Sequence, residues 1–163
     1  MSRVALALGA NLGDRLGNLR RAVRELTAAG WTVERASDVF ETPPFGDEDQ
    51  PPFLNACLVA SVPEEDPEAA LRFLKDLEGR MGRIPRHRNG PREIDLDLLF
   101  WDDRVLQTPE LTLPHPGIPQ RAFVLVPLLQ VAADWVHPAL RKTVAELARD
   151  VSSEGIVRIV SLS

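Results

Sequence analysis

The stretch that decides the fold is residues 92–99, which read REIDLDLL. Successive side chains of a β-strand point to opposite faces, so Asp95 and Asp97 share one face of this segment. Leu96 and Leu98 lie on the other face, where Ile94 joins them. An apolar face of this kind is buried against helices. The stretch therefore predicts a strand whose sheet carries helices on one side and two carboxylates on the other.

The apolar pattern on either side of this strand gives the order of the other elements. Helical spacing predicts a helix over 16–26, and Asp66 before Pro67 marks the start of a second one reaching Met81. Apolar and β-branched runs predict strands at 4–8, 31–42, 53–62 and 94–101. The resulting order β-α-β-β-α-β is that of a ferredoxin-like α+β sandwich, in which one antiparallel sheet packs on two helices.

The rest of the chain adds smaller pieces to this sandwich. The turn Asp102-Asp103 predicts a short partner for the fourth strand around Val105. Glycine and proline exclude regular structure from 82–93, and prolines predict a loop at 113–119. A helix at 122–133, a capping box that opens a short helix at Thr143, and an edge strand at 156–160 complete the C-terminal additions.

Composition bounds the class of protein. The 163 residues carry no repeat or linker, so we expect a single domain over 1–163. A net charge of −5 argues against broad binding to nucleic acid. Apolar runs are short, so no membrane span is expected, and the N-terminus is typical of a strand rather than a signal peptide. Cys57 is the only cysteine, which makes the reducing cytoplasm the simplest location and a buried structural thiol the expected state.

Asp95 and Asp97 are the first candidates for chemistry. Adjacent carboxylates repel each other unless a cation or a shared proton lies between them, and hard oxygen ligands suit Mg²⁺. The alternative is a solvated strand face, but an arginine-rich loop leads directly into this strand. Arginines bind phosphate oxygens through paired hydrogen bonds, and the two features together are typical of phosphoryl transfer. The arginines of this region are Arg80, Arg83, Arg86, Arg88 and Arg92.

No familiar nucleotide cradle accompanies these residues. The P-loop pattern is absent, and Gly9 with Gly13 does not match the dinucleotide-binding pattern. His115 lies in a proline-rich loop before Arg121, and both are suitable donors to charged oxygens if they are not merely structural. The histidines have no zinc-ligand spacing.

A second candidate site is a small-molecule pocket formed by residues 42–46 and 53–55, which read TPPFG and FLN. Prolines restrict the backbone there, phenylalanine can stack on a flat ring, and asparagine can match ring donors and acceptors. The alternative is that these aromatic residues belong to the core.

The combined motifs resemble a known family, the 6-hydroxymethyl-7,8-dihydropterin pyrophosphokinases of folate biosynthesis. The stretch RNGPREIDLDLL at 88–99 resembles the family signature, and supporting matches fall at 8–14, 41–46, 53–55, 113–116 and 121–125. The resemblance implies a ferredoxin-like fold and transfer of pyrophosphate from ATP to the hydroxymethyl group of the pterin. It also implies two Mg²⁺ ions bridged by Asp95 and Asp97.

The resemblance also assigns roles to individual side chains. Arg83, Arg92 and Asp97 would be catalytic. The pterin would be bound by Thr42, Pro43, Phe45, Phe53, Asn55 and Phe123. The nucleotide would be bound by Glu78, Arg86, Leu98, Thr112, His115 and Arg121, with Arg88 as the alternative to Arg86. Two positions depart from the family pattern: Asn89 stands where some relatives carry tryptophan, and Glu110 stands where a basic residue can contact the nucleotide.

Two functions from other classes remain open at this point. A ferredoxin-like RNA-binding module would use the arginines, but it lacks the expected aromatic pair, and the aspartates would repel RNA. A ligand sensor would bind nucleotide without chemistry. The chain is expected to be a monomer or a homodimer, with ATP and the pterin as its partners.

Overall fold

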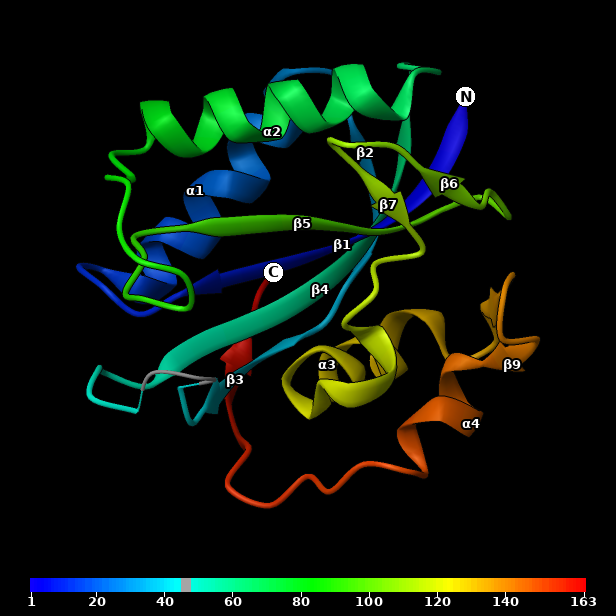
Figure 1. The fold of residues 1–163 in the computed structure, drawn as a ribbon. Helices are drawn as coiled ribbons and strands as arrows, with labels where there is room; N and C mark the ends of the chain where they lie inside the picture. Colours follow the sequence, from blue (N-terminus) through cyan, green and yellow to red (C-terminus); the bar gives the residue numbers. More distant parts are fainter. Residues whose placement is uncertain (45–47) are drawn as a thin grey trace.

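A six-stranded antiparallel sheet forms the centre of the molecule in a computed structural model that describes residues 1–44 and 48–163. β1 (Ser2–Ala10) lies between β4 (Phe53–Val62) and β5 (Asp95–Trp101). On the far side of β4 follow β3 (Asp38–Thr42) and then β10 (Val157–Ser161), while β2 (Thr32–Ala36) also pairs with β4. Figure 1 shows β1 running between β4 and β5.

Two helices cover one face of this sheet, α1 (Arg15–Ala28) and α2 (Pro67–Arg80) (Figure 1). The Asp66 side chain caps α2 by accepting the Glu68 N–H, and Pro67 occupies the first turn. Leu96 and Leu98 of β5 are buried in the same core cluster as Leu19 and Leu74 of the helices. The β-α-β-β-α-β order and the ferredoxin-like arrangement are therefore confirmed.

The C-terminal third covers the opposite face. α3 (Ala122–Ala132) and α4 (Val144–Ala148) lie below the sheet in Figure 1 and enclose a second core cluster around Phe100 and Leu125. The capping box predicted at Thr143 is present, with Glu146 as its partner. These elements make the molecule three layers deep and place the start of α3 beside the ends of β3 and β4.

The second predicted strand is wrong as a single element, because 31–42 forms both β2 and β3. The break occurs at Ser37, whose hydroxyl donates to the Asp38 carbonyl at 2.7 Å and accepts the Cys57 N–H at 2.9 Å. A side chain that bonds the local backbone competes with the regular ladder. Cys57 itself is fully buried, and burial raises the pKa of its thiol, as expected for a structural cysteine.

Short elements complete the fold. β6 (Leu106–Gln107) was expected to pair with the fourth strand, but it pairs with β7 (Thr112–Leu113), because the chain turns away from the sheet after Trp101. A 3-10 turn (Ile118–Gln120) leads into α3, and β8 (Val136–His137) pairs with β9 (Lys142–Thr143). Among the described residues, no helix has the length and apolar character needed to cross a membrane.

Candidate active site

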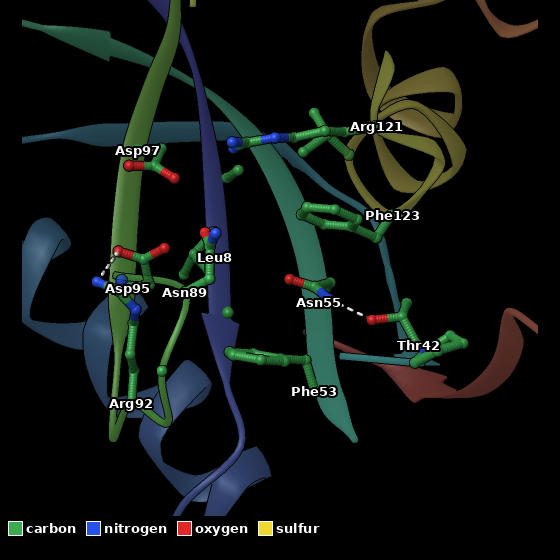
Figure 2. A pocket seen from close by; sticks show the side chains of 15 residues that line it. Leu8, Thr42, Phe53, Asn55, Asn89, Arg92, Asp95, Asp97, Arg121 and Phe123 are labelled. Carbon is green, nitrogen blue, oxygen red and sulfur yellow. Dashed lines mark hydrogen bonds and ion pairs between the residues drawn. The ribbon is translucent and has the colours of Figure 1, made fainter. Parts of the chain in front are cut away.

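One pocket lies where the ends of β3, β4 and β5 approach the start of α3, and it holds about 630 Å³ of empty space when the solvent at its open side is included (Figure 2). The loop that precedes β5 closes one side. The pocket brings together most of the residues that the sequence assigned to the pterin, the phosphates and the metal. Its lining includes Thr42, Pro43, Phe53, Asn55, Arg92, Asp95, Asp97, Arg121 and Phe123. Phe45 lies outside the described residues.

The residues predicted to bind the pterin form a slot with an aromatic ring on each side. In Figure 2, Phe53 and Phe123 stand on either side of Asn55, and all three side chains line the pocket. The Asn55 Nδ2 donates to the Thr42 Oγ1 at 2.7 Å, so the amide is held with its oxygen facing inward. A Cβ on Gly9 would lie 2.7 Å from the Asn55 Oδ1, so glycine on the neighbouring strand makes room for this amide. A flat ring with hydrogen-bonding edges fits such a slot.

Asp95 and Asp97 face the pocket from the opposite wall, as strand parity predicts (Figure 2). They pair in the sheet with Gly9 and Ala7 of β1, which carry no large side chain over the carboxylates. Burial, and after it the negative charge of Asp95, raise the pKa of Asp97 to about 7. A bound cation would offset the repulsion between these two carboxylates.

The donor chemistry of this pair fits Mg²⁺. Carboxylate oxygens are hard ligands, and Mg²⁺ commonly takes one or two of them together with water and substrate phosphates. Within 1–44 and 48–163 no group of three or more His, Cys, Asp or Glu side chains is arranged to hold a metal ion. A metal here would therefore depend on the nucleotide for part of its coordination.

Arg83 and Arg92 bring positive charge to the same carboxylates. The Arg83 Nη1 lies 3.1 Å from the Asp95 Oδ1, and the Arg92 Nη1 lies 3.8 Å from it. Arg92 also lines the pocket, whereas Arg83 approaches Asp95 from the side of α2. Both guanidinium groups are mostly shielded from solvent, which strengthens their attraction for anionic oxygens.

Glu78 is engaged by the protein rather than facing the pocket. Its side chain is only 3% exposed. Its Oε2 accepts the Leu96 N–H at 2.7 Å, and its Oε1 accepts from Arg83 at 2.7 Å, with the Lys75 Nζ at 3.4 Å. Burial raises the pKa of this carboxyl. The carboxylate therefore joins α2 to β5 and orients the guanidinium that reaches Asp95.

Arg86 is paired away from the pocket lining. Its Nη1 and Nη2 donate to the two carboxylate oxygens of Glu93 at 2.8 and 2.9 Å. The Arg86 hydrogen bond lowers the pKa of Glu93 to about 2. Arg88 is exposed and does not line the pocket either. The assignment of one of them to phosphate stays a prediction, and Arg86 would have to leave Glu93 to meet it.

His115 is held as a neutral donor. Burial, and after it the positive charge of Arg121, lower its pKa to about 4. Its Nδ1 accepts the Gly117 N–H at 3.0 Å, which leaves the proton on Nε2.

The remaining nucleotide candidates differ in their exposure to solvent: Thr112 is exposed on β7, whereas the Leu98 side chain is 2% exposed in the core. Leu98 can therefore contact a nucleotide only through its backbone.

Comparison with known proteins shows the family of the chain. A model of the family described as 7,8-dihydro-6-hydroxymethylpterin-pyrophosphokinase (HPPK) matches residues 5–133. The chain belongs to this family. It is 41% identical to the 2-amino-4-hydroxy-6-hydroxymethyldihydropteridine pyrophosphokinase of Synechocystis over 93% of this chain and 77% of that protein. The protein of the same description from Methylorubrum extorquens is 40% identical over 98% of this chain and 99% of its own length.

Solved structures agree on the fold of this pyrophosphokinase family member. The crystal structure of Plasmodium falciparum HPPK-DHPS with pteroate superimposes with a TM-score of 0.75, covering 91% of this chain. The match spans 42% of that longer chain, and the sequence identity is 16%. At that identity the likeness concerns the fold alone.

The sequence did not single out Asn11, which organises the pocket loops of this pyrophosphokinase. Asn11 is 2% exposed, and its Oδ1 accepts the Arg92 N–H at 2.8 Å. Its Nδ2 donates to the Gln50 Oε1 at 2.8 Å and to the Pro51 carbonyl at 2.9 Å. Gln50 in turn donates to the Asn89 carbonyl at 2.6 Å. The signal in the sequence was a polar residue directly after an apolar strand. An amide that is buried there needs several hydrogen-bond partners, and loops beside the strand can supply them.

The two departures from the family pattern also have structural counterparts. Asn89 lines the pocket with a φ of 60°, a conformation that asparagine tolerates, but it supplies no aromatic surface. Glu110 is exposed and lies 3.8 Å from the Arg72 guanidinium of α2. A basic side chain therefore stands near position 110 even though that position itself is acidic.

Proposed function

We infer that this pocket is the place where the chain transfers pyrophosphate from ATP to the hydroxymethyl group of 6-hydroxymethyl-7,8-dihydropterin, in folate biosynthesis. The observation that carries the inference is the meeting of two unlike walls in one pocket. One wall is the slot of Phe53, Phe123 and Asn55, and the other is the Asp95 and Asp97 pair. The pterin would therefore lie directly opposite the groups that handle phosphate.

The slot accounts for recognition of the ring. Stacking of a flat ring on aromatic side chains contributes about 0.5–1.5 kcal/mol beyond the area that is buried. The Asn55 amide, fixed by Thr42, presents an oxygen to ring N–H groups and so selects the pterin edge. A ring held in this orientation directs its hydroxymethyl arm toward β5.

In the reaction the hydroxymethyl oxygen loses its proton, which is released to solvent, and forms a bond to the β-phosphorus of ATP, while the bond from that phosphorus to the α,β-bridging oxygen breaks. AMP leaves, and the pterin diphosphate is the other product. Arg92 and Arg121 line the pocket and would bind the phosphate oxygens, whose charge shifts during transfer. The chain thus acts mainly by positioning the two substrates and by electrostatic stabilisation.

We further propose that Asp95 and Asp97 hold Mg²⁺, with two ions in the complete complex. When bound, Mg²⁺ would neutralise phosphate charge. Arg83, which Glu78 orients, already lies against Asp95, so the Arg83 guanidinium and the Mg²⁺ ions would act on the same phosphates.

We also propose one domain over 1–163, since the sheet takes strands from both ends of the chain. We propose a cytoplasmic location, since the single cysteine is buried and unpaired.

The test is an assay of AMP. The protein is incubated with ATP, Mg²⁺ and 6-hydroxymethyl-7,8-dihydropterin, and AMP is measured with and without the pterin. We expect pterin-dependent AMP that is abolished by a chelator and by the double substitution of Asp95→Ala with Asp97→Ala. Absence of pterin-dependent AMP would refute the activity. AMP formation that survived the double substitution would instead refute the metal assignment.

A further inference from the structure

The C-terminal segment lies against the wall of the pterin slot. β10 pairs with β3 so that Val157 is opposite Glu41 and Arg158 is opposite Phe40. Continuing this antiparallel register by two residues puts position 155 opposite position 43. The pairing does not extend there as hydrogen bonds, because Pro43 has no N–H to donate. Any contact at this position is therefore a packing contact.

That contact occurs at Gly155. Its φ is +81°, and a Cβ added there would lie 3.1 Å from the Pro43 Cγ and 3.7 Å from its Cδ. Two independent constraints thus favour glycine at this position, the left-handed backbone and the close approach to the proline ring. Pro43 lines the pocket and directly follows Thr42, the residue that holds Asn55.

The residues around Gly155 indicate that its contact with Pro43 supports the wall of the pterin slot. A second hollow of about 570 Å³ shares Thr42, Pro43, Arg121 and Phe123 with the site pocket and is lined on its other side by Ser152, Glu154 and Ile156. The shared residues form a partition between the two spaces. Because open space lies behind much of the partition, a close backbone contact at Gly155 restrains Pro43 from the rear.

The segment itself is anchored well enough to act as a support. Arg20 of α1 donates to the Ser161 and Leu162 carbonyls at 3.0 and 3.3 Å. The Leu162 N–H donates to the Ser37 carbonyl, and the Leu162 side chain is buried in the core. Arg158 donates to the Asp38 carboxylate at 2.9 Å. The end of the chain is thus fixed to both α1 and β3.

From this geometry we propose that Gly155 is a positioning residue for pterin binding: the C-terminal segment holds Pro43 and Thr42, and through them Asn55, at the spacing that the ring requires. The inference rests on the proposed function of the pocket. It also extends the machinery beyond residues 5–133, where the family match ends. The segment is expected to change pterin affinity and to leave the carboxylate pair on β5 unaffected.

The test compares Gly155→Ala with Gly30→Ala. Gly30 also has a positive φ, +98°, but a Cβ there would meet only Pro63 at 3.8 Å, beyond the opposite end of β4. Both substitutions introduce the same kind of backbone strain. We expect Gly155→Ala to raise the pterin KM about tenfold, since misplacement on the order of 1 Å has large effects, with the ATP KM within about twofold. Gly30→Ala should leave both constants unchanged.

A second variant and a binding measurement separate the outcomes. Asparagine tolerates a positive φ but also carries a Cβ. Gly155→Asn therefore presses a Cβ against Pro43, as Gly155→Ala does, with a smaller loss of stability. Both Gly155 variants should bind 6-hydroxymethylpterin more weakly by equilibrium fluorescence without ATP. If wild type binds and turns over the pterin and a folded Gly155 variant matches it, the positioning role is overturned. If wild type neither binds pterin nor forms AMP, the proposed function is overturned and this inference with it.

Discussion

The two walls of the pocket are built in opposite ways. The wall from β3 and β4 is neutral, and the hydrogen bond from the Asn55 amide to the Thr42 hydroxyl fixes the amide with its oxygen facing the pocket. The wall from β5 gathers charges that do not balance, so that burial and Asp95 raise the pKa of Asp97 to about 7. The neutral wall needs no counter-charge before substrate binds. We propose that the repelling carboxylates of the other wall are neutralised when a cation and phosphates bind.

The largest effect should come from the charged wall. Asp97→Asn removes a ligand charge where the phosphates react, so kcat should fall on the order of 10³-fold. Pterin binding should stay within about twofold, because the substitution leaves the neutral wall intact. Steady-state kinetics and equilibrium binding of the pterin check this. Asp103→Asn, an exposed acid just beyond the same strand, is the control and should behave as wild type.

A change in the neutral wall should give the reverse pattern. Asn55→Ala removes the amide that faces the ring and leaves the buried Thr42 hydroxyl without its partner. The pterin KM should rise about tenfold to a hundredfold, in line with the loss of one or two hydrogen bonds, while the ATP KM stays unchanged. Ser61→Ala, at the other end of β4, is the matched control. Equal increases in both KM values would show that the walls are not independent.

The link between α2 and β5 should separate catalysis from stability. Glu78→Gln keeps the shape but weakens the hold on Arg83, so kcat should fall about tenfold. Stability should change by less than about 1 kcal/mol, because removal of a buried charge offsets the lost ion pair. Glu78→Ala leaves the Leu96 N–H and Arg83 unpaired and should cost about 3 kcal/mol. Urea unfolding of both variants beside their kinetics measures the separation.

The smallest effect concerns the edge strand that supports the neutral wall. Arg158 and then Gln130 hydrogen-bond to Asp38 and hold its pKa below the ordinary value of 3.8. Because the folded-state pKa is lowered, this stabilisation is present above pH 4 and is lost as the pH falls through the folded-state value. Arg158→Ala should therefore be slightly less stable than wild type at pH 7, since exposed ion pairs contribute little. Urea unfolding at pH 7 and pH 3 should show the difference shrinking; a difference that grows in acid would contradict it.

The agreement between sequence and fold depends on how local each signal is. The parity of Asp95 and Asp97, the Asp66 cap and the Thr143 capping box each depend on neighbouring residues, and all three have the predicted geometry. The break at Ser37 escaped prediction because it depends on Cys57, twenty residues away on another strand. The same limit applies to β6, whose partner is selected by where the chain goes after Trp101.

The sequence by itself determined the order of the elements, the paired carboxylates on one face of β5 and the residue types suited to a ring and to phosphates. Only the tertiary structure decided which of these side chains share one pocket. It engaged Glu78 with Arg83, paired Arg86 with Glu93, and joined two loops through Asn11. It also brought Gly155 against Pro43. The physical reason is that periodicity and capping act within a few residues, whereas these contacts depend on strand register and helix packing between distant segments.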